Sequence, residues 1–316
     1  MAILLQNIPL ADYTTYKVGG PAKYFAEARN KKDIVDALSE YNNYSPINKK
    51  IFILGGGANT LFSDEGYDGL VLKISMTDIA ISGDNIICVD AGANLQDVLL
   101  FAVEHNLTGM EWAAGIPGSF GGALRGNAGA FGKEMKDCVI SAKSVSIQNC
   151  KEIIERQNNE IMFGYRTSVF KSDAKSEIIL SGEIKLLPGN AIDIQTKIQS
   201  HINYRKEKQP LEWPSAGSTF KNVDVSKITQ EQLQEWKDVI KTDPFPVIPI
   251  AFLISKAGLK GKAVGGAMIS EKHSNFFINT GNAKASDIKN LINFTKQVIR
   301  EKFNLEIEEE IQIVNS

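Results

Sequence analysis

The sequence predicts a globular fold of mixed helices and strands that is divided into two or three domains. Its 316 residues exceed the length of one average domain. A hydrophobic content of 43% with 23% charged residues is typical of a protein that buries a sizeable core. Strand-like and helix-like segments alternate along the chain until Pro188-Gly189 interrupts them. We therefore expect a domain boundary near residue 190.

The part before this boundary is rich in predicted strands and contains two capped helices. Short apolar or alternating runs predict strands at 23–28, 51–54, 70–74, 86–91, 139–147 and 178–187. Asn30 with Asp33, and Asn94 with Asp97, are typical of helix N-termini, so a helix is expected after each.

The chain after this boundary is predicted to begin with a helix. Ile194, Ile198 and Ile202 recur at a period of four, which indicates a helix directly after the boundary. A polar helix is expected over Ser226–Lys241, and an amphipathic helix is expected to begin at Ser286-Asp287. Alternation from Leu305 to Val314 predicts a final strand.

A glycine-rich stretch, residues 115–132 (GIPGSFGGALRGNAGAFG), is the strongest functional signal. Glycines let backbone N–H groups approach an anion and permit positive φ angles, as a bound diphosphate requires. A structural cluster of turns is the alternative. A second glycine turn, residues 55–60 (GGGANT), follows a predicted strand, but Thr60 replaces the last glycine of a GxGxxG fingerprint and no Walker A loop follows. This segment is either a phosphate-binding turn of another kind or only a tight turn.

Charge and cysteine content exclude several classes of function. The net charge is −2 and no basic block stands out, so a nucleic-acid surface is not expected. No apolar segment is long enough to cross a membrane, and the N-terminus does not resemble a signal peptide. Cys88, Cys138 and Cys150 lack metal-site spacing, and His273 has no second ligand nearby, so no metal is predicted. We expect a cytoplasmic protein whose Trp112, Trp213 and Trp236 lie in the core.

Arg166 and Ser218 are candidates for chemistry on the residues alone. Arg166, in FGYRTS, is suited to holding a carboxylate or an oxyanion, although a surface ion pair is an equal alternative. Ser218 follows Gly217 in a tight motif without a GxSxG elbow, so it is expected to donate a proton rather than attack. The cluster Glu306–Glu310 is most simply a solvated strand face, on which strict alternation singles out Glu309.

Taken together, the motifs resemble those of the bacterial UDP-N-acetylenolpyruvoylglucosamine reductase family, in the family's order from about Thr14 to Val314. The matching segments are TYKVGGPA, LGGGANTLFSD, AGIPGSFGGALRGNAGAFG, FGYRTSVFK, PSAGSTFKN, AGLKGKAVGGAMIS, HSNFFIN and the terminal Glu-Ile strand. The span from Arg166 to Ser218 is too short for an additional tyrosine loop, so the chain resembles the shorter type of this family.

The resemblance implies an α+β fold with a vanillyl-alcohol-oxidase-like (PCMH-type) FAD-binding domain of two subdomains, followed by an α+β substrate-binding domain. The expected parts are residues 1–75 and 76–190 for the FAD subdomains, 191–304 for the substrate domain and 305–316 for a strand carrying a catalytic glutamate. Extra sequence at 226–244 departs from the shorter type. We expect it to form a surface helix, with a partner-binding element as the alternative.

The resemblance also assigns site residues. Catalytic roles fall on Arg166, Ser218 and Glu310; a β-bulge can rotate a strand residue, so we prefer Glu310 to Glu309. Substrate contacts fall on Arg205, Lys208, Asn222 and His273, the first two at the UDP phosphates. Contacts with FAD fall on Tyr16, Gly55, Gly56, Gly57, Ala58, Asn59, Thr60, Gly115, Ile116, Pro117, Gly118, Ser119, Gly121, Gly122, Asn127 and Gly129.

The implied activity is NADPH-dependent, FAD-mediated reduction of UDP-N-acetylglucosamine enolpyruvate to UDP-N-acetylmuramate, a peptidoglycan precursor needed for cell shape and division. Arg166 and Glu310 stabilise an enediolate and Ser218 protonates the α-carbon. The expected partner is this small molecule, and a monomer is expected, with weak self-association as the alternative. Competing hypotheses are an FAD-linked alcohol oxidase of the same flavin-binding fold and a non-catalytic flavin-binding protein. The glycine-rich stretch contains no His or Cys, so a covalent flavin there is disfavoured.

Overall fold

The computed structural model describes residues 3–44, 50–242 and 245–316, and the chain divides into two compact units. The first unit comprises Met1–Ile8, Ala22–Gly56 and Asp68–Arg205. The second unit comprises Pro9–Pro21, Gly57–Tyr67 and Lys206–Ser316. Two short N-terminal stretches therefore belong to the same unit as the last third of the chain. The domain borders expected near residues 75, 190 and 304 stay predictions.

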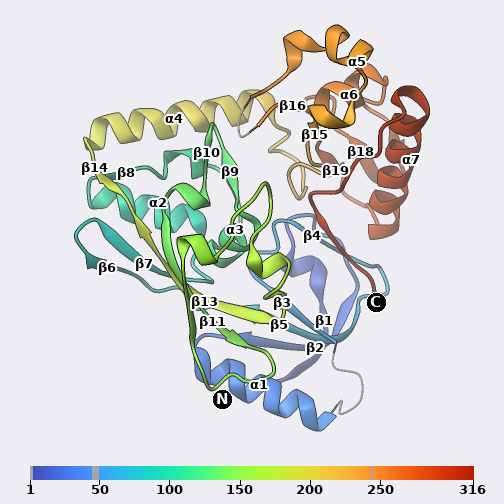
Figure 1. The fold of residues 1–316 in the computed structure, drawn as a ribbon. Coiled ribbons are helices and arrows are strands. Elements are labelled where there is room, and N and C mark those ends of the chain that lie inside the picture. The colour runs from blue at the N-terminus through green and yellow to red at the C-terminus, as the bar shows by residue number, and fades with distance from the viewer. Residues whose placement is uncertain (1–2, 45–49, 243–244) are drawn as a thin grey trace. The chain divides into compact units, whose positions relative to one another are not determined.

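One sheet of the first unit has four strands in the order β1-β2-β5-β3 (Figure 1). Its strands are β1 (Leu5–Pro9), β2 (Pro21–Ala28), β3 (Ile51–Leu54) and β5 (Tyr67–Ile74). β3 runs parallel to β5, and helix α1 (Lys31–Tyr44) lies between β2 and β3 in the chain. The Asp33 N–H donates to Asn30 Oδ1 at 2.9 Å, so the predicted N-terminal cap is confirmed.

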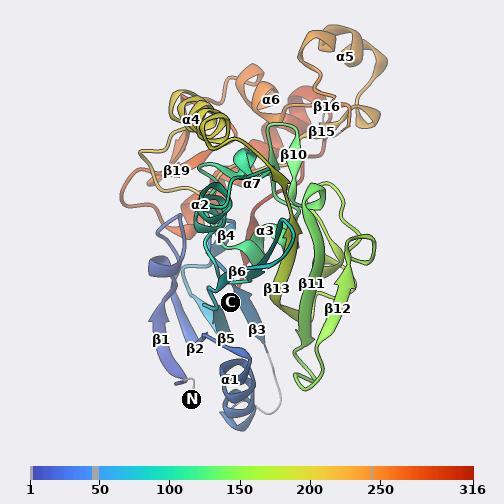
Figure 2. The same cartoon turned by 90° about the vertical axis from the view of Figure 1, so that its left-hand side faces the viewer.

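The other large sheet of this unit has five antiparallel strands in the order β12-β11-β13-β7-β6. Figure 2 shows β12, β11 and β13 side by side. Its strands are β6 (Ile79–Gly83), β7 (Ile86–Asp90), β11 (Val139–Ser146), β12 (Ile154–Gln157) and β13 (Glu177–Lys185). A Cβ atom on Gly182 of β13 would lie only 3.0 Å from the Phe120 ring. The absent side chain lets helix α3 (Phe120–Gly126) pack closely on this sheet.

Further helices and two pairs of short strands complete the described part of the first unit. They are α2 (Leu95–Glu104), β8 (Leu107–Thr108) paired with β14 (Leu187–Pro188), the hairpin of β9 (Gly129–Ala130) and β10 (Lys133–Glu134), and most of α4 (Ala191–Lys208). The predicted Asn94 cap is confirmed, because its side chain accepts the Gln96 N–H at 2.9 Å. Buried apolar residues from both sheets and from α1, α2 and α3 form one core.

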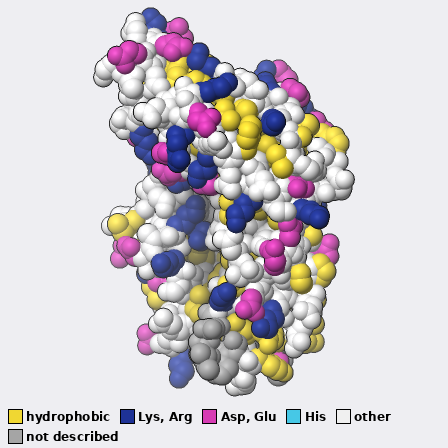
Figure 3. Space-filling view, turned by 90° about the vertical axis from the view of Figure 1, so that its right-hand side faces the viewer, with side chains coloured by type: hydrophobic (Ala, Val, Ile, Leu, Met, Phe, Trp, Pro, Cys, Tyr) yellow, Lys and Arg dark blue, Asp and Glu magenta, His cyan; other side chains and the backbone are white. Residues whose placement is uncertain are grey.

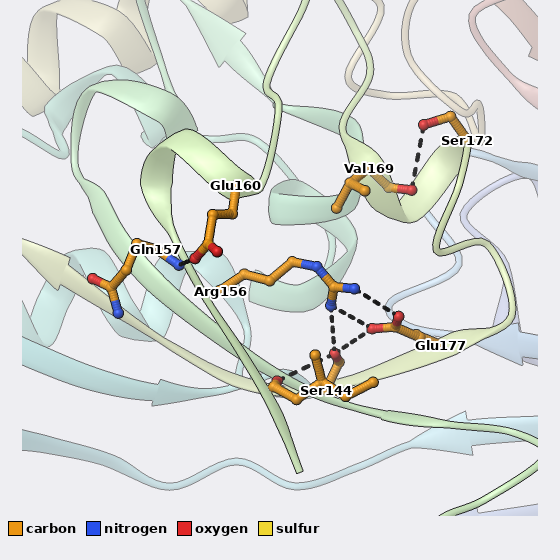
Figure 4. A network of polar contacts seen from close by, with 8 residues as sticks. Ser144, Arg156, Gln157, Glu160, Val169, Ser172 and Glu177 are labelled. Carbon is orange, nitrogen blue, oxygen red and sulfur yellow. Dashed lines mark hydrogen bonds and ion pairs between the residues drawn. The ribbon is translucent and has the colours of Figure 1, made fainter. Parts of the chain in front are cut away.

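An ion pair braces the five-stranded sheet (Figure 4). Arg156 on β12 donates two hydrogen bonds to the Glu177 carboxylate on β13, at 2.6 and 2.8 Å. The Ser144 hydroxyl on β11 donates to the same carboxylate at 2.5 Å. The two charged side chains are only 20% and 10% exposed. This largely buried, bidentate ion pair and the serine hydroxyl thus join three strands.

Removing one charge of this pair is expected to destabilise the first unit. Glu177→Gln leaves the Arg156 guanidinium partly buried without its counter-ion, so we expect a loss of about 2 kcal/mol in the free energy of unfolding. Urea denaturation of purified protein measures this loss. The matched control is Asp68→Asn, which breaks an exposed pair with Lys23 and should leave the free energy of unfolding unchanged. Equal effects of the two variants would contradict the bracing role of Glu177.

The described part of the second unit combines small sheets with α-helices. Its strands are β4 (Thr60–Phe62) parallel to β20 (Gln312–Val314), β15 (Val223–Asp224) with β16 (Val247–Ile248), and β17 (Ala263–Val264), β18 (Ala267–Ile269) and β19 (Phe277–Asn279). Its helices are α5 (Gln230–Glu235), α6 (Ile250–Lys256) and α7 (Ala285–Phe303). The predicted amphipathic helix is confirmed as α7, whose apolar residues enter a second core.

The predicted helix over residues 226–241 is wrong in extent. The structure has only the six residues of α5 there, with a single 3₁₀ turn on each side. Thr229 caps α5 through its hydroxyl, which accepts the Gln232 N–H at 3.2 Å. Asp243 and Pro244, at the end of the predicted insertion, lie outside the described residues.

Tryptophan burial follows the prediction at two positions of three. Trp236 is 2% exposed, and its ring contacts the Phe252 and Phe303 rings edge-on at centroid distances of 6.0 and 5.6 Å. These contacts anchor the polar insertion in the second core. Trp112 is also buried, whereas Trp213 is 40% exposed, so its predicted core position is wrong.

Asp64 caps helix α7 from a distant part of the chain. Its carboxylate accepts the Ala285 and Ser286 N–H groups at 2.7 and 2.9 Å. Burial alone raises the pKa of this carboxyl, but hydrogen bonds from Ser286 and Ala285 and the charge of Lys284 outweigh it and hold the pKa below 3.8. A carboxylate at a helix N-terminus stabilises both the free N–H groups and the helix dipole.

This cap gives an expected pH dependence. Because the folded pKa is lowered, the ionised cap stabilises the second unit above the usual pKa and loses its effect as the pH falls through the lowered one. Asp64→Ala should cost about 1 kcal/mol at pH 7. The difference from wild type should shrink below the usual pKa of 3.8. Urea denaturation at several pH values measures it, and a difference that stays constant into acid would contradict an ionised cap.

Candidate active site

In the first unit, the two predicted glycine turns meet at Ser119. Its hydroxyl accepts the Gly56 and Gly122 N–H groups at 3.2 and 3.3 Å. A Cβ atom on Gly55 would lie 2.4 Å from the Ser119 hydroxyl, and one on Gly56 would lie 2.6 Å from the Gly118 Cα atom. The backbones of the two turns therefore pack directly on each other, which only glycine allows.

Much of this backbone remains accessible. Gly56, Gly115 and Gly122 are exposed, and Gly55 and Gly118 are half-buried. A bare, accessible backbone on a rigid scaffold suits the diphosphate of a dinucleotide such as FAD. The structure brings these glycines together, and their contacts with FAD stay predictions.

Two other predicted cofactor residues of this stretch are committed to packing. A Cβ atom on Gly121 would lie 2.8 Å from the Ala91 side chain, so this glycine permits close approach of α3 to β7. Gly129 lies in the β9–β10 hairpin, where a Cβ atom would lie 2.6 Å from Glu134. Their contacts with FAD stay predictions.

Gln96 supports the glycine-rich stretch and was not predicted. Its Nε2 donates to the Ala113 and Ile116 carbonyl oxygens, both at 2.8 Å, and its Oε1 accepts the Gly115 N–H at 2.8 Å. The side chain thus holds the loop that contains Pro117. Only the position of Gln96 in the first turn of α2, after a capped start, could have drawn attention to it.

Gly57, Ala58, Asn59, Thr60 and Tyr16 belong to the second unit. Gly57 has a φ of 63°, and a Cβ atom there would meet the Tyr13 carbonyl oxygen at 1.9 Å. Asn59 Nδ2 donates to the Glu310 carbonyl oxygen at 3.0 Å, and Asn59 O accepts the Gln312 N–H at 2.8 Å. The end of the triple-glycine turn therefore contacts the predicted catalytic strand.

Tyr16 packs in the second core. Its side chain is fully buried, and burial raises the pKa of its hydroxyl, an effect that interactions with Thr219 and the Ala216 backbone partly offset. Its carbonyl oxygen accepts Asn279 Nδ2 at 3.0 Å. These contacts give Tyr16 a structural role. Its contact with FAD stays a prediction.

Arg166 lies at a strained turn of the first unit. Its φ of 57° is left-handed, a conformation that is unfavourable for an arginine and recurs at functional sites. The turn is closed by hydrogen bonds between Gly164 and Thr167 at 3.0 and 3.2 Å. Arg166 Nη2 donates to the Gly129 carbonyl oxygen at 3.1 Å, and Lys171 Nζ donates to the Arg166 carbonyl oxygen at 2.8 Å.

Asn127 holds this turn against the glycine-rich stretch. It is fully buried and itself left-handed, with a φ of 45°. Its Nδ2 donates to the Gly164 carbonyl oxygen and its Oδ1 accepts the Lys136 N–H, both at 3.0 Å. The side chain is thus engaged by protein at both ends, and its predicted contact with FAD stays a prediction.

The two basic residues predicted at the UDP phosphates differ in their surroundings. Arg205 is 8% exposed, donates from Nε to the Ala114 carbonyl oxygen at 2.7 Å, and lies 5.2 Å from the centre of the Phe131 ring. Lys208 is exposed and lies 2.7 Å from Glu207. Burial lowers the pKa of the Arg205 guanidinium, but an arginine remains charged.

The second unit brings Ser218 and Glu310 together. The segment 218–221 lies beside the segment 308–311: the Lys221 N–H donates to the Glu308 carbonyl oxygen at 2.9 Å. The Thr219 carbonyl oxygen accepts the Glu310 N–H at 2.8 Å and the Ile311 N–H at 3.5 Å. Ser218 and Glu310 are both half-buried.

This shared carbonyl is the mark of a β-bulge, so regular alternation does not hold at the end of the chain. The predicted strand over 305–314 is shortened to β20, the last three of those residues. Glu309 makes an ion pair with Lys296 of α7 at 2.9 Å. Glu308 pairs with Lys221 and Lys227 at 3.2 and 2.9 Å. Glu309 therefore has a structural partner in α7. The choice of Glu310 over Glu309 as the catalytic carboxylate stays a prediction.

His273 and Asn222 also lie in the second unit. His273 is half-buried, and burial lowers the pKa of its imidazole; its Nδ1 accepts the Asn275 N–H at 3.3 Å, which leaves the proton on Nε2. Asn222 Oδ1 accepts the Ile250 N–H at 3.1 Å and so caps α6. Their contacts with substrate stay predictions.

Known protein families match both the first and the last part of the chain. Residues 22–149 match the FAD binding domain, and residues 209–314 match the UDP-N-acetylenolpyruvoylglucosamine reductase, C-terminal domain. A curated UDP-N-acetylenolpyruvoylglucosamine reductase of Caldanaerobacter subterraneus is 40% identical over 98% of this chain and 93% of its own length. The chain belongs to the UDP-N-acetylenolpyruvoylglucosamine reductase family.

Further members of the family support this assignment. The reductase of Lachnoclostridium phytofermentans is 36% identical over 98% of this chain and 92% of its own length. A crystal structure of the reductase from Thermus caldophilus superimposes with a TM-score of 0.78 at 26% identity, covering 99% of this chain and all of that one. The family match confirms the predicted fold class, with its FAD-binding domain of the PCMH type.

On the face drawn in Figure 3, Lys and Arg side chains are interspersed with Asp and Glu. Among the described ranges, no cluster of three His, Cys, Asp or Glu residues is arranged to hold a metal ion. No helix in the described part of the chain has the length and apolar character needed to cross a membrane.

Proposed function

We propose that this protein is an FAD-containing reductase that converts UDP-N-acetylglucosamine enolpyruvate to UDP-N-acetylmuramate, with NADPH as the reductant. The observation that carries this proposal is the match to a curated reductase over 98% of the chain at 40% identity. The product is a peptidoglycan precursor, so the expected place of action is the cytoplasm. The expected partner is the sugar nucleotide itself, and we expect a monomer.

The accessible glycines around Ser119 hold the FAD diphosphate in this proposal. Their N–H groups and small size suit an anion, and Gln96 keeps the loop in place. Bound at these glycines, reduced FAD would supply the hydride for the vinyl methylene of the substrate. The proposed reaction needs no amino-acid side chain as an electron donor.

Arg166 and Glu310 act on the substrate carboxylate. Addition of hydride to the methylene carbon places negative charge on the neighbouring carboxylate, as an enediolate. The Arg166 guanidinium neutralises this charge, and Glu310 in its protonated form donates a hydrogen bond to the same group. Preorganised donors of this kind typically lower a barrier by about 3–4 kcal/mol each.

Ser218 completes the reduction by donating its hydroxyl proton to the α-carbon. Two electrons and two protons are then accounted for: the hydride carries both electrons and one proton, and the hydroxyl gives the second proton. The serine recovers its proton from solvent. Arg205 and Lys208 hold the UDP phosphates, and Asn222 and His273 contact the remainder of the substrate.

An anaerobic experiment tests this function. The flavin of the purified protein is reduced with NADPH, UDP-N-acetylglucosamine enolpyruvate is added, and flavin absorbance is followed. Rapid reoxidation with formation of UDP-N-acetylmuramate is the expected result. Reoxidation only after oxygen is admitted would instead establish an oxidase, and a protein that binds no FAD would refute the proposal.

A further inference from the structure

The segment 218–221 lies between two other segments of the second unit and is joined to each by an isolated β-bridge, so we call it the middle strand. On one side it bonds to residues 308–311, through the Lys221 N–H and the Thr219 carbonyl oxygen. On the other side Ser218 forms a bridge to Phe276, and the Thr219 N–H donates to the Asn275 carbonyl oxygen at 2.8 Å. The position of Ser218 therefore depends on both neighbours.

The side chain of Asn275 supplies two further bonds to this middle strand. Its Oδ1 accepts the Phe220 N–H at 3.0 Å, and its Nδ2 donates to the Phe220 carbonyl oxygen at 2.9 Å. Asn275 is 4% exposed. The amide thus replaces a peptide unit of a neighbouring strand, at a buried place where water is a poor substitute for either bond.

Both ends of the Phe220 peptide are consequently fixed two residues from Ser218. The same strand also sets Glu310, whose N–H donates to the Thr219 carbonyl oxygen. The Asn275 amide, the Phe220 backbone and the Thr219 carbonyl form one connected set of hydrogen bonds. A shift of the middle strand would move Ser218 against Glu310.

We propose that Asn275 is a positioning residue that sets the register of Ser218 relative to Glu310. The proposal rests on the proposed function, in which these two side chains act on the α-carbon and the carboxylate of one substrate. Asn275 acts through the backbone of Phe220 and not on the substrate. A displacement near 1 Å in such an arrangement typically slows a reaction about 10²-fold.

The two half-reactions separate this role from a general loss of structure. Reduction of the flavin by NADPH requires neither Ser218 nor Glu310 in the proposed mechanism, whereas reoxidation by the enolpyruvyl substrate requires both. A register error is therefore expected only in the second half-reaction. A loss of folded protein would lower both in proportion.

The test uses Asn275→Ala and Asn275→Asp in the full chain, with both half-reactions followed anaerobically by stopped flow. For Asn275→Ala we expect reoxidation by the substrate to slow about 10–100-fold, with flavin content and reduction by NADPH unchanged. Asn275→Asp keeps an acceptor for the Phe220 N–H. The rate of reoxidation by this variant should recover as the pH falls. A protonated carboxyl donates to the Phe220 carbonyl oxygen, whereas a carboxylate and that oxygen repel each other.

Asp64→Ala is the matched control, since it weakens the same unit at the cap of α7 and should leave both half-reactions unchanged. Normal reoxidation by folded Asn275→Ala, or parallel loss of both half-reactions, would overturn the positioning role. If Asn275→Ala does not fold, a normal Asn275→Asp at neutral pH would overturn it. A wild-type protein that never transfers hydride to this substrate would refute the proposed function, and this proposal with it.

Discussion

Replacing Ser218 with alanine is expected to slow reoxidation of the reduced flavin by the enolpyruvyl substrate about 10²–10⁴-fold, the usual contribution of a positioned general acid. Alanine removes the hydroxyl proton that the α-carbon must receive. Reduction of the flavin by NADPH should keep its wild-type rate, because that step transfers no proton to carbon. Single-turnover absorbance of each half-reaction measures both rates.

Ser215→Ala is the matched control for this variant. Ser215 lies in the same motif and is half-buried, and its hydroxyl accepts the Gly217 N–H at a long 3.5 Å. Its removal should change neither half-reaction. A Ser218→Ala protein that forms UDP-N-acetylmuramate at a near-normal rate would exclude Ser218 as the acid and point to water or another group.

Replacing Arg166 with glycine is expected to separate activity from stability. The guanidinium that neutralises the enediolate is lost, so reoxidation by the substrate should fall about 10²–10³-fold. The fold should not suffer in the same way, because glycine accepts the left-handed φ of 57° that is unfavourable for arginine. Flavin kinetics and urea denaturation of the same preparation measure the two effects.

Met162→Gly is the control for the backbone effect. Met162 is also left-handed, with a φ of 51°, and its side chain is 64% exposed. It should gain stability without any loss of activity. Arg166→Lys keeps the charge without the planar guanidinium, so its rate of reoxidation by the substrate should lie between those of wild type and Arg166→Gly. Near-normal reoxidation by Arg166→Gly would show that another cation binds the carboxylate.

The sequence predicted those parts of the fold that depend on local signals. Asn30 and Asn94 cap their helices as expected, and the apolar period of α7 places its residues in the second core. Local signals failed where tertiary contacts decide the conformation. Residues 226–241 form only α5 between two tight turns, while Trp236 enters the second core.

The sequence named candidate site residues but not the geometry that holds them. Alternation alone singled out Glu309, yet the bulge opposite Thr219 ends the regular strand, and Lys296 occupies Glu309. That bulge depends on pairing between distant segments, which no local pattern encodes. The same holds for Gln96 and Asn275, whose amides bind backbone atoms far away in the chain. An isolated Asn or Gln carries no local sign of such a task.

The pairing of β4 with β20 bears on how the chain folds during synthesis. β4 is made before most of the first unit, whereas its parallel partner β20 is made after all of it. Most strands of the first unit pair with segments made before residue 190, so that unit is able to fold while translation continues. β4 has to wait with an open edge, which exposes this short strand of the nascent chain to mispairing and to chaperones.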